Sequence, residues 1–309
     1  MFIFLFFLLG VFIFTTIYTH YRGEVRFSFN RQITNHSTLM APINVFMYIF
    51  SKIPTTPYIN INEYPEIKYL IENWKIIRDE ALFLHNEGNI TDAKDNDDIG
   101  FNSFFKRGWK RFYLTWYGTI IPSALRTCPR TIELISNIEC IKGAMFAYLP
   151  KNSVLGKHRD PYAGSIRFHL GLKTPNDPNC FIDVDGKRYI WKDGEGVLFD
   201  ETYLHYVENN TDHDRLIFMC DIERKMSNKI ASYVNSMFNK IIMSATVAKN
   251  IEDDPIGGIN SFFKKISFIV EKYEYYRKKL KKNPFYYKIY YLIKYGLLIV
   301  LLYYCIKMI

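Results

Sequence analysis

The stretch that decides both the fold and the candidate site is LGKHRDPYAGSIRFHLGL, residues 155–172. Within it His158 and Asp160 are separated by one residue. On an extended strand their side chains would point to the same face and could bind one metal ion. The alternative is a polar turn at a strand edge, because a short His-x-Asp pair is a weak signal by itself. Other residues are therefore needed to support a metal site.

A second histidine, His205, lies further along the chain in FDETYLHYVEN. Two histidines and one carboxylate form the facial triad of non-haem Fe(II) oxygenases, which leaves coordination positions open. Arg215 begins the run RLIFMCD, and a guanidinium can bind a carboxylate in a bidentate manner. Arg167 and His169 alternate along the predicted strand, so both face one side and could donate to a second carboxylate. These residues fit an iron-chelating dicarboxylic acid.

Residues 136–226 are expected to form the β core. Its expected strands, separated by turn residues, are 144–149, 165–172, 180–184, 187–191, 196–199, 203–207 and 215–220. Asp185-Gly186 predicts a tight hairpin and Asp193-Gly194 a second turn. Evenly spaced strands without intervening helices favour a jelly roll over a parallel sheet. We expect a mainly β protein whose metal site lies at the open mouth between two sheets.

The regions on either side of this core are expected to pack against it. Residues 21–135 include a helical periodicity at 65–85 and the run FNSFFKRGWKRFYLTWY at 101–117. That run fits either a membrane-headgroup contact or a half-buried strand pair with a solvated face. Residues 227–283 are expected to be helical and basic, with a helix over 227–250.

Both chain ends indicate a membrane. Residues 1–20 contain an uncharged apolar run about long enough to cross a bilayer as a helix. No basic residue precedes the run and no small-residue cleavage site ends it, which disfavours a cleavable signal peptide. Arg22, Arg26 and Arg31 follow it, so the positive-inside rule predicts a cytoplasmic catalytic domain. A second segment, 284–309, could span the membrane or lie in its interface.

The amino-acid composition restricts the classes of partner that the protein is expected to bind. The net charge is +9 and the chain has 24 Tyr and 25 Phe, but no nucleic-acid-binding motif accompanies them. A membrane surface is the expected partner, and nucleic acid is not. Five cysteines without a CxxC spacing predict no disulfide framework, as in a reducing compartment.

Four segments carry a family resemblance: HRDPYAGSIRFHLGL, FDETYLHYVENNTDHDRLIFMCDIER, CPRTIEL and FFKRGWKRFYLTWYG. They resemble the aspartyl/asparaginyl β-hydroxylase family of Fe(II)- and 2-oxoglutarate-dependent dioxygenases, and within it most closely the branch that hydroxylates lipid A. The similarity extends from about Pro42 to about Met226. It implies a double-stranded β-helix in which three side chains bind Fe(II): His158, Asp160 and His205.

The resemblance also implies how the cosubstrate is held. Arg215 would bind the distal carboxylate of 2-oxoglutarate, with Arg167 and His169 near its iron-bound end. Peptide-modifying members carry Gly where this chain has Asp160, so Asp160 favours the lipid branch. They also carry a Ser near the position of Ala147 that helps to hold 2-oxoglutarate, and this chain has no hydroxyl there.

The function that the resemblance implies is hydroxylation at C2 of a secondary acyl chain of lipid A, or of its lipopolysaccharide precursor. The reaction would take place at the cytoplasmic face of the inner membrane, with succinate and CO2 as co-products. Two alternatives are a peptide β-hydroxylase and a non-enzymatic, membrane-anchored jelly roll that binds a glycolipid. Among the site residues, His169 could instead be a hydrogen-bonded core histidine, and Arg167 a structural ion-pair partner.

Overall fold

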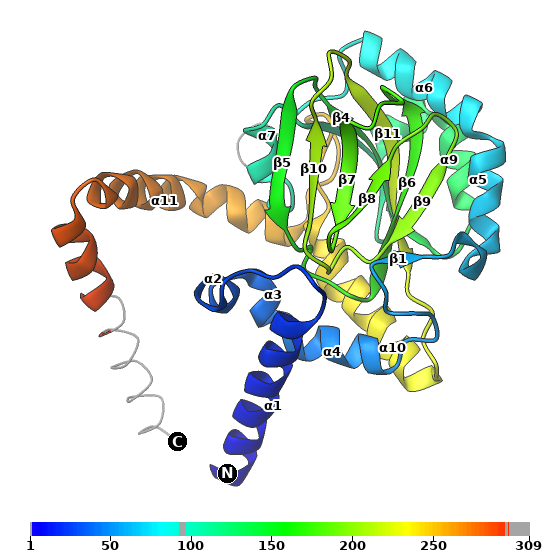
Figure 1. The fold of residues 1–309 in the computed structure, drawn as a ribbon. Coiled ribbons are helices and arrows are strands. Elements are labelled where there is room, and N and C mark those ends of the chain that lie inside the picture. Colours follow the sequence, from blue (N-terminus) through cyan, green and yellow to red (C-terminus); the bar gives the residue numbers. More distant parts are fainter. Residues whose placement is uncertain (1, 93–96, 294–295, 297–309) are drawn as a thin grey trace.

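Short runs rich in β-branched and aromatic residues form two antiparallel sheets at the centre of the molecule (Figure 1). The computed structural model describes residues 2–92, 97–293 and 296. Its strands are β1 (Tyr58–Ile59), β2 (Lys110–Trp116), β3 (Thr119–Ile120), β4 (Ile141–Leu149), β5 (Ser153–His158), β6 (Ser165–Lys173), β7 (Cys180–Val184), β8 (Lys187–Ile190), β9 (Gly196–Phe199), β10 (His205–Asn209) and β11 (Arg215–Glu223).

The two sheets face each other across one hydrophobic core, the arrangement of a jelly roll. One has seven strands in the order β1-β9-β6-β11-β4-β2-β3, and the other has four in the order β5-β10-β7-β8. Phe146 of β4 and Phe218 of β11 belong to the same buried cluster as Leu155 of β5 and Ile182 of β7. The expected mainly β, double-stranded β-helix fold is therefore confirmed.

The seven predicted strands are all present, with ends that differ by a few residues. The predicted hairpin is also present: Asp185 and Gly186 have φ values of 55° and 82°, and Val184 pairs with Lys187 across them. Positive φ at both central residues is the geometry that an Asp-Gly turn favours. Strand β5 was not predicted, because 153–158 mixes Lys, Gly and Ser with few β-formers.

The seven-stranded sheet extends beyond the expected core of 136–226, because β1, β2 and β3 come from earlier in the chain. Strand β2 lies within 101–117 and pairs with β4, and four of its aromatic and aliphatic side chains are buried: Phe112, Tyr113, Leu114 and Trp116. The strand interpretation therefore holds for this part of the run. Burial in the sheet explains its aromatic content.

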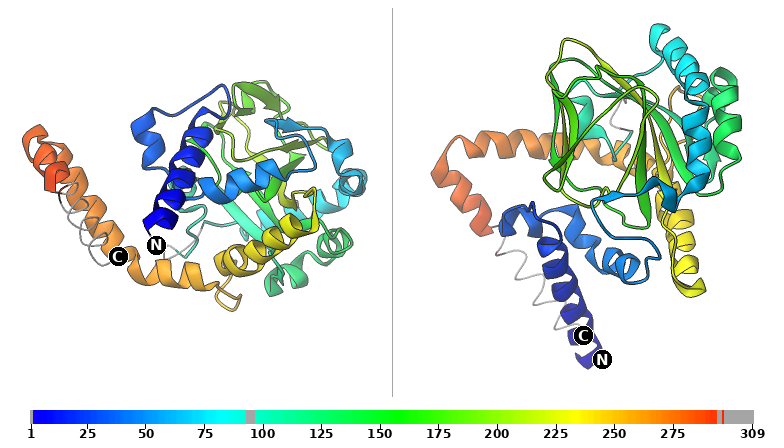
Figure 2. Two further views of the ribbon diagram at one scale, coloured as in Figure 1. Left: turned by 90° about the horizontal axis from the view of Figure 1, so that it is seen from below. Right: turned by 45° about the vertical axis from the view of Figure 1, so that its right-hand side comes forward.

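Helices surround the sheets. Their bounds are α1 (Phe2–Tyr21), α2 (Phe29–Ile33), α3 (His36–Leu39), α4 (Ala41–Ile49), α5 (Lys68–Glu72), α6 (Trp74–Asn86), α7 (Asn102–Phe105), α8 (Pro122–Thr127), α9 (Pro129–Ser136), α10 (Lys229–Phe238) and α11 (Gly258–Lys281). Short 3-10 turns lie at Ile61–Glu63, Pro65–Ile67 and Ser244–Thr246, and a π turn at Asn239–Met243 follows α10. Helices α5, α6 and α9 lie on one side of the barrel (Figure 2).

Two helix predictions need correction. The single helix expected over 65–85 is divided into α5 and α6 at Asn73, whose side-chain amide donates to the Tyr69 carbonyl at 2.8 Å. An asparagine that bonds to nearby backbone in this way competes with continued helix formation. The helix expected over 227–250 is regular only in α10 and ends with the 3-10 turn at Ser244–Thr246.

Helices α1, α4 and α10 lie at one end of the barrel, and α1 projects away from it (Figures 1 and 2). The stretch Ile3–Tyr21 of α1, with a mean hydropathy of 2.0, is long and apolar enough to cross a membrane. The second expected segment, 284–309, lies mostly outside the described residues, although 284–293 are helical. The four described cysteines are all free, in agreement with the expected lack of disulfides.

A buried ion cluster connects the end of α1 to the barrel. The Asp200 carboxylate accepts hydrogen bonds from Arg22 and Arg224, each at 2.7 Å. Its other oxygen accepts the Thr202 backbone N–H at 3.0 Å. Burial by itself would raise the pKa of Asp200, but the two guanidinium groups hold it below the ordinary value. Asp200 is therefore ionised and fully paired.

Candidate metal centre and its cavity

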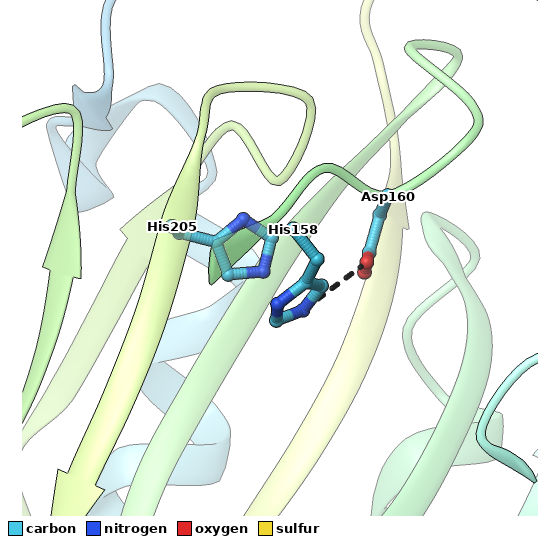
Figure 3. A group of neighbouring side chains, drawn as sticks. All are labelled: His158, Asp160 and His205. Atoms are coloured by element: carbon cyan, nitrogen blue, oxygen red, sulfur yellow. Dashed lines mark ion pairs between the residues drawn. The ribbon is translucent and has the colours of Figure 1, made fainter. Parts of the chain in front are cut away.

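Two adjacent strands bring the predicted metal ligands together. His158 is the last residue of β5 and His205 the first residue of β10, and the two are directly paired in the sheet. Their ring centroids are 4.1 Å apart. Asp160 completes the group, in which the candidate ligand atoms all lie within 4.8 Å of one another. Figure 3 shows the three side chains directed toward one point.

Contrary to the expectation from the sequence, Asp160 does not share a strand with His158. Strand β5 ends at His158, and Asp160 lies in the loop that follows. Pro161 comes next and removes a backbone donor that a continued strand would need. The Asp160 backbone N–H instead donates to the Glu201 carbonyl at 2.9 Å. That bond fixes the carboxylate beside the two rings.

Backbone carbonyls set the tautomer of both histidines. His158 Nδ1 lies 2.7 Å from the Gly156 carbonyl oxygen, and His205 Nδ1 lies 2.9 Å from that of Tyr203. A carbonyl oxygen can only accept, so each Nδ1 carries the hydrogen and each Nε2 keeps its lone pair for a metal. Burial lowers the pKa of His158, and burial together with His158 lowers that of His205 to about 3. Both rings are neutral, as metal binding requires.

A charged network orients the carboxylate ligand. Arg167 Nη1 lies 3.1 Å from Asp160 Oδ2, Arg167 Nε lies 2.7 Å from Asp221 Oδ1, and its third nitrogen contacts Glu201. Burial would raise the pKa of Asp160, but Arg167 and the two histidines lower it below its ordinary value. Burial raises the pKa values of Glu201 and Asp221, which share the same guanidinium. Of the three carboxyl groups that contact Arg167, Asp160 is thus the one whose pKa is lowered.

The ligand group opens into a cavity between the sheets. Its apolar wall includes Phe104 of α7, whose ring centroid lies 4.7 Å from that of His158. Arg167 and His169 both line the cavity, so the face of β6 that they share is directed into it. Ala147 lines it too, so no hydroxyl is present at that point of the wall.

Two further polar side chains in the cavity have buried nitrogen atoms without a hydrogen-bond partner among the described residues. Arg215 is 2% exposed, its guanidinium stacks 4.4 Å from the Trp191 ring centroid, and its Nε has no hydrogen-bond partner. It forms no salt bridge with any residue that the structure describes, and burial lowers its pKa to about 10. Both ring nitrogens of buried His169 also lack partners. A buried cation without a counter-ion is costly, so this cavity is suited to an anionic ligand.

These features test whether iron and a dicarboxylate fit. The donor set is two neutral imidazole nitrogens and one carboxylate, the set that non-haem Fe(II) sites use. The unpaired Arg215 and His169 supply the donors that a carboxylate-bearing cosubstrate needs. The residues therefore fit both groups.

Some members of the site were not predicted from the sequence. Glu201 and Asp221 both contact the Arg167 guanidinium, and Trp191 stacks on that of Arg215. Glu201 lies four residues before His205 in the FDETYLH run, so its position beside a predicted ligand was a usable signal. No local pattern marks Asp221 or Trp191, because strand pairing and the contact between the sheets bring them to the site.

A jelly roll with two histidines and one aspartate converging at its mouth defines the class of metal-dependent oxygenases with a facial triad. Within that class, the profile of the aspartyl/asparaginyl β-hydroxylase family matches residues 71–225, half of the chain. The protein therefore belongs to the aspartyl/asparaginyl β-hydroxylase family.

Similar proteins include a lipid-modifying one. The ornithine lipid ester-linked acyl 2-hydroxylase of Rhizobium tropici is 30% identical over 148 residues, which are 47% of this chain and 52% of the relative. The human aspartate beta-hydroxylase domain-containing protein 2 is 30% identical over 186 residues, 57% of this chain and 49% of the relative. The chain thus spans about half the length of these relatives. A prolyl-4-hydroxylase structure from Pseudomonas putida aligns with 14% identity and a TM-score of 0.36, covering 60% of this chain and all of that one.

Proposed function

We propose that the protein is an Fe(II)- and 2-oxoglutarate-dependent hydroxylase of a membrane-lipid acyl chain, acting at C2 of a secondary acyl chain of lipid A or its lipopolysaccharide precursor. The proposed location is the cytoplasmic face of the inner membrane. One observation supports the proposed chemistry above all. A His-Asp-His group and the Arg215 guanidinium, which forms no salt bridge with a described residue, line the same cavity.

Each site residue has a defined task in this proposal. His158, Asp160 and His205 would hold the metal, and Arg215 would bind the distal carboxylate of 2-oxoglutarate, with Arg167 and His169 near its other end. When bound, Fe(II) and 2-oxoglutarate would supply, with dioxygen as the oxidant, the chemistry that turns a C–H bond into an alcohol. One oxygen atom would enter the alcohol and the other the succinate, which is released together with CO2. The protein's contribution is to fix geometry and to exclude water from the apolar cavity.

The choice of a lipid substrate rests on where the ligand loop is fixed. His36 Nε2 of α3 lies 2.6 Å from the Arg159 carbonyl oxygen, and the Asn44 amide of α4 donates to the Pro161 carbonyl at 2.9 Å. The loop that carries Asp160 is therefore held by the helices beside α1. The similarity to an ornithine lipid acyl hydroxylase and the retention of Asp160 both favour a lipid.

Mass spectrometry of lipids tests the proposal. Cells that express the chain should contain lipid A in which one acyl group is heavier by a single oxygen, and cells without it should lack this species. Fragmentation should place the oxygen at C2. Hydroxylation of another acylated lipid would correct the substrate, whereas an unchanged lipid extract together with a hydroxylated peptide would support the peptide-modifying alternative.

Arg215→Lys is expected to raise the 2-oxoglutarate concentration needed for half-maximal turnover. A lysine cannot form the bidentate pair, and losing one hydrogen bond to a charged group costs about 1.5–3 kcal/mol, or roughly 10- to 100-fold in affinity. The measurement is succinate release against 2-oxoglutarate concentration. Arg188→Lys, at an exposed position of β8, is the control, and an unchanged requirement in Arg215→Lys would contradict the assignment.

A further inference from the structure

Helix α10 and the π turn after it carry an exposed apolar stripe. Its members are Ile230, Tyr233, Met237 and Ile241, which are 74%, 65%, 42% and 58% exposed. Their spacing of three or four residues places them along one side of the helix. Among the residues that the structure describes, no buried cluster includes these four side chains. The stripe is therefore a surface that the fold leaves uncovered.

The opposite side of α10 is firmly attached to the barrel. The Asn235 side chain accepts a hydrogen bond from the Tyr162 hydroxyl at 2.6 Å and donates to the Gly164 carbonyl at 3.0 Å. Phe238 stacks on Tyr162 with a centroid separation of 4.2 Å. Packing on the core thus accounts for the buried side of α10 but leaves the stripe unexplained.

Further exposed apolar side chains lie at the same end of the barrel, from which α1 leaves (Figure 1). Exposed apolar side chains on the nearby helices α2, α3 and α4 are Phe29, Ile33, Leu39 and Ile49. Helices α4 and α10 meet in one cluster, in which Tyr48 and Val45 are buried and Phe238 packs against them. We call these eight side chains, four on α2–α4 and four on α10 and its π turn, the apolar rim.

The charge of this end matches an anionic lipid surface. Residues 25–62 and 227–246, which form the rim helices, contain no Asp or Glu, although the chain has 31 acidic residues. They do contain Lys and Arg, among them Lys229 and Lys240, both exposed beside the stripe. Basic residues at the edge of an apolar surface are attracted to anionic headgroups.

The length of α1 places the rim at the depth of the membrane boundary. All 20 residues of α1 extend about 30 Å, the thickness of a bilayer's hydrocarbon core. Residues 3–14 alone would extend only about 18 Å. The remainder of α1 packs on α4, with Thr15, Thr19 and His20 buried and the Tyr18 ring 6.2 Å from that of Tyr48. If α1 crosses the membrane, α4 must lie at its surface.

The geometry points to a second membrane contact: the apolar rim rests in the interfacial layer of the bilayer, with the stripe of α10 inserted among headgroups and upper acyl chains. This inference rests on the proposed function, a hydroxylase that acts on a membrane lipid, and on α1 being a membrane span, which its length and mean hydropathy allow. Because α10 also packs on Tyr162, two residues beyond Asp160, the rim holds the ligand loop at a fixed height above the lipid. An acyl chain then has a short path to the cavity.

Tryptophan quenching in vesicles tests this contact in the full-length chain. The vesicles contain phosphatidylcholine and phosphatidylglycerol with or without brominated acyl chains, which quench tryptophan on contact. Three variants are compared with wild type: Tyr233→Trp in the stripe, Phe6→Trp in α1, and Phe83→Trp on α6, a 56% exposed position away from the rim. The added emission of Tyr233→Trp and Phe6→Trp is expected to be lost with brominated lipid, whereas that of Phe83→Trp is lost only with aqueous acrylamide.

The possible outcomes distinguish a failure of the rim contact from a failure of the membrane span. If brominated lipid quenches Phe6→Trp but Tyr233→Trp is quenched only by acrylamide, α1 still spans the membrane and the rim contact is overturned. Protection of Tyr233→Trp from both quenchers would also overturn it, since a protein surface such as a second copy would then cover the stripe. Lack of lipid quenching at both positions would overturn span and rim together. Adding Met237→Glu to Tyr233→Trp is expected to reduce lipid quenching at position 233.

Discussion

Replacing Asp160 by Ala is expected to abolish hydroxylation and to weaken divalent-metal binding by more than the roughly 10- to 100-fold typical of outer-shell changes. The substitution removes the only carboxylate from the three-residue ligand group. Arg167 would still contact Glu201 and Asp221, so its charge stays compensated and the fold is expected to persist. Anaerobic titration with Co(II), followed by its visible absorption, measures the affinity without turnover.

The control for this experiment is Asp79→Ala, which removes an exposed aspartate of α6 that pairs only with neighbouring Arg78 among the described residues. It should leave both metal affinity and product formation unchanged. Asp160→Gly is an informative second variant, because the family resemblance implies Gly at this position in peptide-modifying members. Full Co(II) affinity in Asp160→Ala, or full activity in Asp160→Gly, would show that the two histidines suffice and that the aspartate is not a ligand.

Asp200→Asn is expected to lower the free energy of unfolding by roughly 3–5 kcal/mol, the cost typical of breaking a buried ion pair. Asparagine keeps the size of the side chain but leaves two buried cations, Arg22 and Arg224, without their shared anion. Denaturant unfolding of the detergent-solubilised chain measures the change. Asp79→Asn, at an exposed position, should stay within about 0.5 kcal/mol of wild type.

The effect of Asp200→Asn should also depend on pH. The pKa of Asp200 in the folded protein lies below its value of about 3.9 in an unfolded chain. Its stabilising contribution is therefore complete above pH of about 3.9 and is lost as the pH falls through the folded-state pKa. The difference in free energy of unfolding between wild type and Asp200→Asn should therefore become smaller at acidic pH. A small difference in free energy of unfolding at neutral pH would mean that solvent, and not Asp200, compensates the charges of the two arginines.

Much of the barrel was predictable because its strands have a strong local signal. Residues 180–184 and 196–199 are mostly apolar, β-favouring and bounded by turn residues, and they are strands with those same ends. The Asp185-Gly186 turn was predictable for the same reason, since positive φ is a local property. Strand β5 lacks such a signal and is held by its pairing with β10. Its formation depends on tertiary contacts.

The amino-acid sequence specifies which residue types are available: two histidines, one aspartate and two arginines in motifs that resemble a hydroxylase family, and an uncharged apolar run at the start of the chain. Which of these charged side chains have ion-pair partners depends on the three-dimensional arrangement of the strands. Arg167 and Arg215 look alike in the sequence, yet Arg167 contacts three carboxyl groups, whereas Arg215 forms no salt bridge with a described residue. The reason is physical: charge compensation in a core depends on distances between strands, and these are fixed by sheet register and not by local sequence.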